Sequence, residues 1–382
     1  MISVCIKSCE HNLYWIDSQS SFLKNPNLES LRDEIDKIDT QVVNLLNQRV
    51  HTAAEIGKIK TAMGIDPYDP AREAQVFSKI GDLSKGPMRE DSLKTIYREV
   101  ISASIALEKE LVIGYLGPEA TYTHQAAVKN FGSTLDYRSL FDIPDVFNAV
   151  ESGECDYGVV PIENSTEGAV NRSLDLLVES ELSIIAQVYL KVEHCLFSLG
   201  KASEIQEIQS KDQALAQCGE WIRRNFPQAI LTPVTSTAEG VKNCKKGNGM
   251  AAIAGELAGR IHEVPMLERG IQDKKNNVTR FLVVSRKALP HSQKITYRTS
   301  LVVTLSDQVG ALQSALTPFS SRGINLCKIE SRPSRKKSWD YYFFIDFIGH
   351  SMEEDVRSAL SELEANCSFY KILGSYPENS PE

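Results

Sequence analysis

The fold of this chain is organised around the stretch VVPIENSTEGAV, residues Val159–Val170. An apolar run from Tyr157 to Ile162 ends there in five polar side chains and a glycine, and a helical pattern of leucines begins at Leu174. This order predicts a strand, a polar turn and a helix. Because the first backbone N–H groups of a helix have no partner inside it, such a turn favours an anion.

Two acids stand in this turn, Glu163 and Glu167, and they leave two interpretations open. A site that combines anion binding with acid chemistry could be built from them. The same residues would also make an ordinary capped turn with solvated carboxylates. Spacing alone does not separate the two, so the rest of the chain has to.

Length, composition and net charge limit the classes of protein to which this chain can belong. A chain of 382 residues with 42% apolar residues is typical of a globular protein of two or three domains. Its net charge of -8 argues against a general nucleic-acid binder. No apolar run approaches the roughly 18 residues that span a bilayer, and residues 1–25 lack the apolar core of a signal peptide. We therefore expect a cytoplasmic protein with no membrane partner.

Metal and nucleotide sites are also not expected. The eight cysteines form no C-x-x-C pair, and Cys5 and Cys9, the closest two, have no second pair to complete a zinc site. No G-x-G-x-x-G stretch and no P-loop occurs. The sequence thus predicts reduced thiols, no metal and no cofactor.

The first region, residues 26–110, predicts three helices, at about 27–62, 70–80 and 90–108. At about 1.5 Å per residue the first is more than about 40 Å long and needs a partner along its length. Arg49 and Lys60 share one stripe of this helix with apolar residues between them. Cations on such a stripe bind an anion, or else they reach solvent at the end of a bundle.

Four segments of this region resemble the all-helical chorismate mutase family: Leu31–Asp39, Leu45–Arg49, Gly57–Lys60 and Asp69–Glu73. The resemblance implies an intertwined dimer of three-helix chains. It also implies the conversion of chorismate to prephenate without covalent chemistry, by holding a dianion in its reactive shape.

The resemblance assigns roles to eight residues. Arg49 and Arg72 would bind the carboxylates, Lys60 and Glu108 the ether oxygen, Asp69 and Glu73 the hydroxyl, and Ser104 would line the pocket. Arg32 lies about 25 Å along the helix from Arg49, so it would serve the partner subunit's site. Glutamate at 108 can donate to the ether oxygen only when protonated, so we expect mutase activity to fall as pH rises.

The middle region, residues 111–286, alternates strands and helices, which predicts an α/β fold with a mostly parallel sheet. The expected strands are 111–116, 157–162, 182–190, 195–199, 229–233, 250–254 and 281–284. Ligands of such sheets bind where strands end, so the turns after Leu116 and Ile162 are expected to form site walls.

This region resembles the prephenate dehydratase family through Leu116–Thr121, Val159–Val170, Ser236–Glu239 and Asn277–Phe281. The resemblance implies two α/β lobes, similar to a periplasmic binding protein, with the site in the cleft between them. The implied reaction removes carboxylate and the ring hydroxyl from prephenate to give phenylpyruvate. Ala120 departs from the family, which usually has glycine there; a positive φ would be mildly unfavourable for alanine.

Thr279 is, by this resemblance, the residue that contacts the leaving hydroxyl, as a hydrogen-bond donor or relay since threonine is a weak acid. Taken alone it would be an ordinary β-branched residue at a strand start. Glu163 is the turn acid expected to act, because a carboxylate beside a dianion must be protonated or face the hydroxyl. The other expected contacts are Asn164, Ser165, Gln217 and Arg280, with a looser match at Ser210 and Gln213.

After a linker at 287–297, the last region, residues 298–376, predicts the order βαββαβ of a ferredoxin-like unit. It resembles the ACT regulatory domain, whose motifs match at Gly310, Ala311 and Leu312 and at Glu330, Ser331, Arg332 and Pro333. The resemblance implies phenylalanine binding where two such domains pair. Without it, these residues are a turn glycine and a surface ion pair.

Together the three regions resemble the bifunctional chorismate mutase/prephenate dehydratase family. The implied ligands are chorismate, prephenate and the effector phenylalanine, and the implied assembly is a homodimer or homotetramer. Two alternatives stay open: a dehydratase that prefers arogenate, and a non-catalytic amino-acid sensor with a binding-protein-like cleft.

Overall fold

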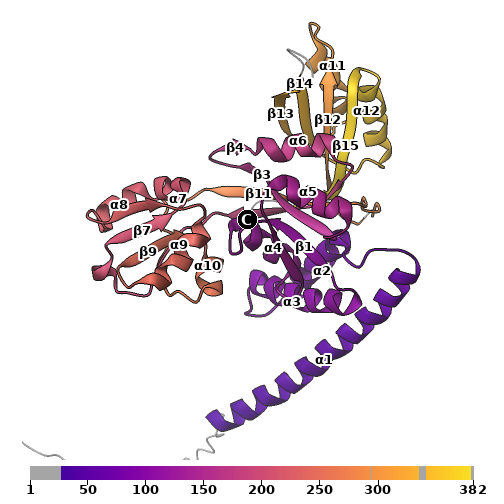
Figure 1. Ribbon diagram of the computed structural model, residues 1–382. Helices are drawn as coiled ribbons and strands as arrows, with labels where there is room; N and C mark the ends of the chain where they lie inside the picture. Colours follow the sequence, from indigo (N-terminus) through magenta and orange to yellow (C-terminus); the bar gives the residue numbers. More distant parts are fainter. Residues whose placement is uncertain (1–26, 293, 335–340, 380–382) are drawn as a thin grey trace, which may run out of the picture. The chain divides into compact units, whose positions relative to one another are not determined.

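The computed structural model describes residues 27–292, 294–334 and 341–379 (Figure 1). The stretch with Cys5 and Cys9, in which the sequence predicts no signal peptide, lies outside the described residues. The chain divides into two compact units, one ending at Arg49 and one beginning at Val50. No helix of the described ranges is long and apolar enough to cross a membrane.

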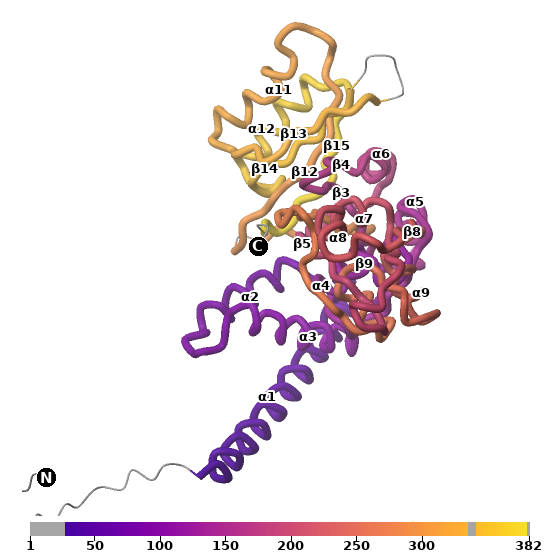
Figure 2. Tube along the Cα trace, turned by 90° about the vertical axis from the view of Figure 1, so that its left-hand side faces the viewer, coloured from indigo at the N-terminus to yellow at the C-terminus, as the bar shows by residue number. Residues whose placement is uncertain are grey.

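The three N-terminal helices are confirmed: α1 at Leu28–Ala62, α2 at Pro70–Leu83 and α3 at Glu90–Glu108. Asp69 caps α2, accepting the Arg72 backbone N–H at Oδ1 over 2.9 Å, and Pro70 occupies the first helical position. Figure 2 shows α2 and α3 running side by side. Helix α1 exposes an apolar stripe, with Leu31, Ile35, Ile38, Ile56 and Ile59 each 41–60% exposed.

The first lobe of the middle region is a six-stranded sheet in the order β2-β1-β3-β11-β5, with β4 paired to β3. Its strands are β1 Val112–Leu116, β2 Asp136–Leu140, β3 Tyr157–Asn164, β4 Gly168–Ala169, β5 Ser183–Lys191 and β11 Val278–Ser285. Its helices are α4 Tyr122–Phe131, α5 Ile143–Ser152 and α6 Asn171–Glu179. Strands β1, β2 and β3 pair in parallel, while β11 lies antiparallel between β3 and β5.

The second lobe is a five-stranded sheet in the order β10-β6-β9-β7-β8. Its strands are β6 Cys195–Ser198, β7 Glu207–Ser210, β8 Ile230–Pro233, β9 Met250–Ala254 and β10 Met266–Arg269. Its helices are α7 Asp212–Gln217, α8 Gly219–Asn225, α9 Thr237–Asn243 and α10 Glu256–Ile261. Only β7 pairs in parallel, with β8 and β9.

Both sheets are therefore mixed, and the expectation of a mostly parallel sheet is wrong. The alternation of strands and helices along the chain cannot reveal that β11 returns from the second lobe and inserts antiparallel into the first sheet. Strand direction is set by this long-range pairing, which leaves no mark on local periodicity.

The C-terminal region has the expected βαββαβ order, in a four-stranded sheet β13-β14-β12-β15. Its elements are β12 Tyr297–Leu305, α11 Ala311–Ser320, β13 Leu326–Pro333, β14 Tyr341–Ile348, α12 Glu354–Glu364 and β15 Cys367–Pro377. Helices α11 and α12 pack on one face of this sheet. The other face shares a hydrophobic core with the first lobe, where Phe344 and Leu373 join Leu174, Leu177 and Ile184.

Candidate active sites

A cavity of about 430 Å³ lies between the two lobes of the middle region. One wall comes from the end of β1 and from the polar turn after β3, as the sequence predicts. The opposite wall comes from α7 and the start of α9. Thr279 on β11 and Asn277, just before that strand, complete the lining. Gly168 allows the turn to close, because its φ of 83° lies in the left-handed region.

Asn164 and Thr279 form the polar centre of this cleft. They face each other across β3 and β11, and the Asn164 Nδ2 donates to Thr279 Oγ1 at 2.8 Å and to Asn277 Oδ1 at 2.7 Å. Asn164 Oδ1 accepts from the backbone N–H of Thr166 at 2.9 Å, which fixes the orientation of the amide. Thr279 Oγ1 is thus an acceptor toward Asn164, and its own O–H can donate to a ligand.

A second polar group crosses the cleft from one lobe to the other. Glu167 Oε1, in the first lobe, accepts hydrogen bonds from the side-chain amides of Gln213 and Gln217 on α7. The Gln217 Oε1 in turn faces His194 Nε2 at 2.8 Å, and His194 Nδ1 lies 2.7 Å from the Tyr122 hydroxyl. Burial lowers the pKa of His194. Because the Gln217 Oε1 can only accept, the Nε2 of His194 is the donor in their hydrogen bond.

Sequence reasoning missed several lining residues. Tyr122, His194 and Lys211 all line the cleft, and Glu167 rather than Glu163 is the turn acid that faces it. No spacing rule connects His194, between β5 and β6, to a glutamine on α7. Only Lys211 supplies a cation among the residues that line this cavity.

Four predicted residues do not line the cleft: Glu163, Ser165, Arg280 and the more loosely matched Ser210, whose Oγ donates to the Ile253 carbonyl. Side chains alternate between the faces of a sheet, and the register pairs Arg280 with Glu163 just as it pairs Thr279 with Asn164. Glu163 Oε2 therefore meets Lys328 Nζ at 2.7 Å on the opposite side, and Arg280 Nη1 meets Asp346 Oδ2 at 2.6 Å.

Ser165 has a structural contact instead. Its Oγ donates to the Asn276 carbonyl at 3.1 Å and accepts from the Val278 N–H at 3.0 Å, which ties the turn to β11. Ala120 does adopt a positive φ, of 66°, and its N–H donates to His124 Nδ1 at 3.1 Å. Its conformation is therefore one that glycine adopts more readily.

Six of the predicted mutase residues lie in the unit that begins at Val50; Arg32 and Arg49 belong to the other unit. Lys60 Nζ donates to the Pro67 carbonyl at 2.8 Å, and Ser104 Oγ to the Val100 carbonyl at 2.7 Å. Asp69 and Arg72 open α2, where the Arg72 guanidinium contacts Gln75 at 3.3 Å.

Glu108 is held against α1 by a glycine. A Cβ on Gly57 would stand 2.4 Å from Glu108 Cγ, so glycine at this position leaves room for the Glu108 side chain. Glu108 Oε2 is buried and has no hydrogen-bond partner among the described residues. Burial raises the pKa of Glu108, and the charge of Lys60 opposes that rise. A ligand acceptor would satisfy this carboxyl if it were protonated.

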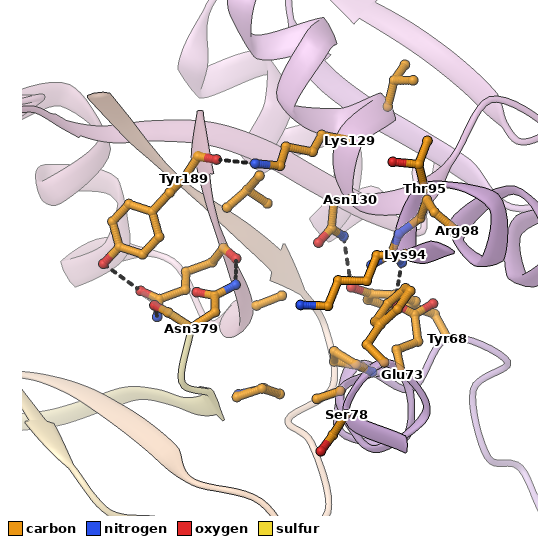
Figure 3. A pocket seen from close by; sticks show the side chains of 18 of the residues that line it. Tyr68, Glu73, Ser78, Lys94, Thr95, Arg98, Lys129, Asn130, Tyr189 and Asn379 are labelled. Carbon is orange, nitrogen blue, oxygen red and sulfur yellow. Dashed lines mark hydrogen bonds and ion pairs between the residues drawn. The ribbon is translucent and has the colours of Figure 1, made fainter. Parts of the chain in front are cut away.

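A larger cavity, of about 660 Å³, is bounded by α2, α3, α4, β5 and the end of β15 (Figure 3). Glu73 Oε2 and Arg98 Nη1 form an ion pair on its wall, with Asn130 donating to the Tyr68 hydroxyl at 2.8 Å beside it. Burial raises the pKa of Glu73 and Arg98 lowers it. The cavity shares only Glu73 with the predicted site residues.

The predicted effector motifs lie at the start of α11 and the end of β13. Gly310, with φ 81°, precedes α11, followed by Ala311 and the exposed Leu312. Arg332 is buried and forms a two-bond ion pair with Asp175 on α6, both contacts at 2.5 Å. The other three residues of the second motif are Glu330, Ser331 and Pro333, on β13.

Comparison with known proteins gives three family matches in order along the chain. They are chorismate mutase type II over residues 31–109, prephenate dehydratase over 113–289 and the ACT domain over 299–365. The bifunctional chorismate mutase/prephenate dehydratase of Aquifex aeolicus (strain VF5) is 42% identical over 356 residues, covering 92% of this chain and 98% of that protein.

Two further matches agree with these. The protein of the same description from Pseudomonas aeruginosa is 38% identical over 358 residues, covering 92% of this chain and 98% of its own. Among solved structures, a prephenate dehydratase in complex with L-Phe from Arthrobacter aurescens has a TM-score of 0.65 at 32% identity. That similarity covers 71% of this chain and 92% of the other.

Proposed function

The chain belongs to the bifunctional chorismate mutase/prephenate dehydratase family, and on that premise we propose how its residues divide the two activities. It is an isomerase that converts chorismate to prephenate and a lyase that converts prephenate to phenylpyruvate, under inhibition by phenylalanine. We assign the mutase to residues 26–110, the dehydratase to 111–286 and regulation to 298–376.

The hydrogen bond between Asn164 and Thr279 is the observation that best supports a dehydratase site in the cleft. In the reaction the bond from the ring to its carboxylate breaks, CO₂ leaves, the electron pair enters the ring, and the ring hydroxyl departs as water once it receives a proton. We assign Thr279, whose oxygen accepts from Asn164 at 2.8 Å, as the donor to that leaving oxygen. A donor aimed at developing charge lowers the barrier, while aromatisation of the ring drives the step.

We propose that the opposite wall of the cleft, around α7, binds the two substrate carboxylates. Lys211 supplies the positive charge, and Gln217 and Gln213 supply amide donors, which Glu167 Oε1 orients by accepting from both. We leave Glu163 and Arg280 out of the substrate contacts because both face away from the cleft. Prephenate is the substrate these comparisons support; an arogenate ammonium would instead be attracted to Glu167.

For the mutase we propose the roles that the resemblance implies. Lys60 and protonated Glu108 hold the ether oxygen, Arg49 and Arg72 the carboxylates, and Asp69 and Glu73 the hydroxyl, with Ser104 lining the pocket. The unpartnered Glu108 Oε2 supports this assignment. Arg32 completes the site of a second subunit.

We propose that the chain works as a homodimer or homotetramer. The exposed apolar stripe of α1 supports this, because a helix of 35 residues with such a face buries it against another copy. Phenylalanine would bind where two C-terminal domains meet, between Gly310–Leu312 and Glu330–Pro333. Because Arg332 is paired with Asp175, effector binding there is linked to the position of α6. A cytoplasmic location stays a prediction.

One experiment tests the function. Purified protein is given chorismate, and phenylpyruvate is followed with and without phenylalanine; prephenate and arogenate are then supplied in separate reactions. We expect phenylpyruvate from chorismate, inhibition by phenylalanine and faster turnover of prephenate than of arogenate. No turnover of any substrate would support a non-catalytic sensor, and faster turnover of arogenate would support the aminated substrate.

A further inference from the structure

The C-terminal sheet contacts two charged side chains of the dehydratase sheet. Arg280 Nη1 on β11 pairs with Asp346 Oδ2 on β14 at 2.6 Å, and both side chains are less than a tenth exposed, at 7% and 9%. Glu163 on β3 pairs with Lys328 on β13 at 2.7 Å. The two ion pairs join the catalytic lobe to the regulatory domain. They lie on β3 and β11, which are neighbouring strands of one sheet (Figure 1).

The strand register links these contacts to the cleft. Thr279 pairs with Asn164, and the next pair along the ladder is Arg280 with Glu163. Arg280 therefore follows Thr279 directly in the chain, and Glu163 directly precedes Asn164. In each pair the two side chains lie on opposite faces of the sheet. A displacement of either charged residue moves its strand, and the backbone passes that movement to the neighbouring cleft residue.

The Arg280 contact is built as a closed network. Its Nε donates to Gln187 Oε1 on β5 at 2.9 Å, and its Nη2 to the Tyr376 hydroxyl on β15 at 2.8 Å. The other Asp346 oxygen accepts from the Ser300 hydroxyl on β12 at 2.5 Å. Several strands therefore fix one guanidinium, and a buried ion pair of this kind does not tolerate the loss of one partner.

We propose that Asp346 and Lys328 of the C-terminal domain are positioning residues for the dehydratase reaction. Through Arg280 and Glu163 they hold Thr279 and Asn164 at the spacing that aims the Thr279 hydroxyl at the leaving oxygen. The proposal rests on the dehydratase activity assigned above and extends it to residues outside the catalytic lobe. It also gives the regulatory domain a direct mechanical connection to the reacting groups.

The test compares Lys328→Met, Asp346→Asn and a charge reversal, Glu163→Lys with Lys328→Glu, in the full chain. We expect each single substitution to lower the dehydratase kcat about tenfold or more with little change in KM, since small misplacements of reacting groups are costly. The charge-reversed pair should recover most of the kcat. Mutase activity, measured in the same samples, should stay at the parent level.

Arg322→Met is the matched control, because it breaks an ion pair with Glu362 within the C-terminal domain, on the helix side of its sheet. It should leave the dehydratase kcat unchanged. Unchanged kcat in Lys328→Met and Asp346→Asn would overturn the proposal, as would a rise in KM alone. If Asp346→Asn fails to fold, the less buried Glu163–Lys328 pair decides by itself. A parent protein without dehydratase activity would instead refute the proposed function.

Discussion

The Asn164 amide nitrogen donates to the Thr279 hydroxyl oxygen at 2.8 Å, between two antiparallel strands whose paired residues here are 115 positions apart in sequence. This contact turns an ordinary strand threonine into an oriented donor. It also explains why a turn rich in polar groups follows β3, since Asn164 needs that turn's N–H groups to fix its own amide.

Replacing Asn164 by aspartate should reduce dehydratase activity strongly. The carboxylate has the shape of the amide but no N–H to give Thr279, and it repels a dianion. We expect a fall in kcat on the order of 100-fold, the scale of losing one oriented donor. The rate of phenylpyruvate formation from prephenate measures it. A variant with near-parental kcat would show that Asn164 does not orient Thr279.

Two alanine substitutions should separate the activities. Lys60→Ala removes the donor to the ether oxygen and should abolish only chorismate conversion, while Thr279→Ala should abolish only prephenate conversion. Thr279→Ser keeps the hydroxyl and should retain activity. Each variant is assayed with both substrates. Loss of both activities in a folded single variant would contradict separate sites.

The mutase should lose activity as pH rises. Burial raises the pKa of Glu108 more than Lys60 lowers it, and only the protonated carboxyl donates a hydrogen bond. Activity is therefore greatest below this raised pKa and declines as pH rises through it. Because the folded pKa exceeds the unfolded one, stability contributed by Glu108 is lost over the same rise in pH.

Glu108→Gln is the matched variant for this pH dependence, because its amide donates at every pH. Its mutase profile should be flat over the range in which the parent declines. Parallel profiles for parent and variant would remove Glu108 from the ether-oxygen contact. The dehydratase activity of the same samples, measured at each pH, is the control for loss of the folded structure.

Lys211→Ala should weaken prephenate binding. The ammonium group is the cation that lines the cleft, and a charge-assisted hydrogen bond to a carboxylate is worth roughly 1.5–3 kcal/mol, so KM should rise about tenfold or more. Steady-state kinetics with prephenate measure this. Lys211→Arg should retain part of the binding, and an unchanged KM in Lys211→Ala would place the carboxylate elsewhere.

Ile38→Glu on the apolar stripe of α1 should reduce the size of the assembly. Burying a charge against a second copy is unfavourable, and mutase activity should fall with it because Arg32 would no longer reach another subunit's site. Analytical ultracentrifugation and the mutase assay measure both. Glu55→Gln, at an exposed surface pair with Lys58, should change neither. An unchanged assembly would exclude α1 as the interface.

Local sequence determined the helices and the order of the C-terminal domain. The Asp69–Pro70 cap, the helical periodicity of α1 and the βαββαβ order are carried by residues close together in the chain, and all three are confirmed. The motifs were also sufficient to predict the family, and with it both activities.

Tertiary structure alone decided which side chains meet. The sequence predicts that Glu163 and Arg280 line the same site as Thr279. In the structure, the pairing of β3 with β11 places alternate side chains on opposite faces of the sheet. Glu163 and Arg280 therefore form ion pairs with the regulatory domain instead. Glu167 and His194 entered the cleft by contacts with α7 that no local pattern records. The reason is physical: register and strand direction are fixed by partners distant in sequence, and a shift of one residue exchanges the two faces of a strand.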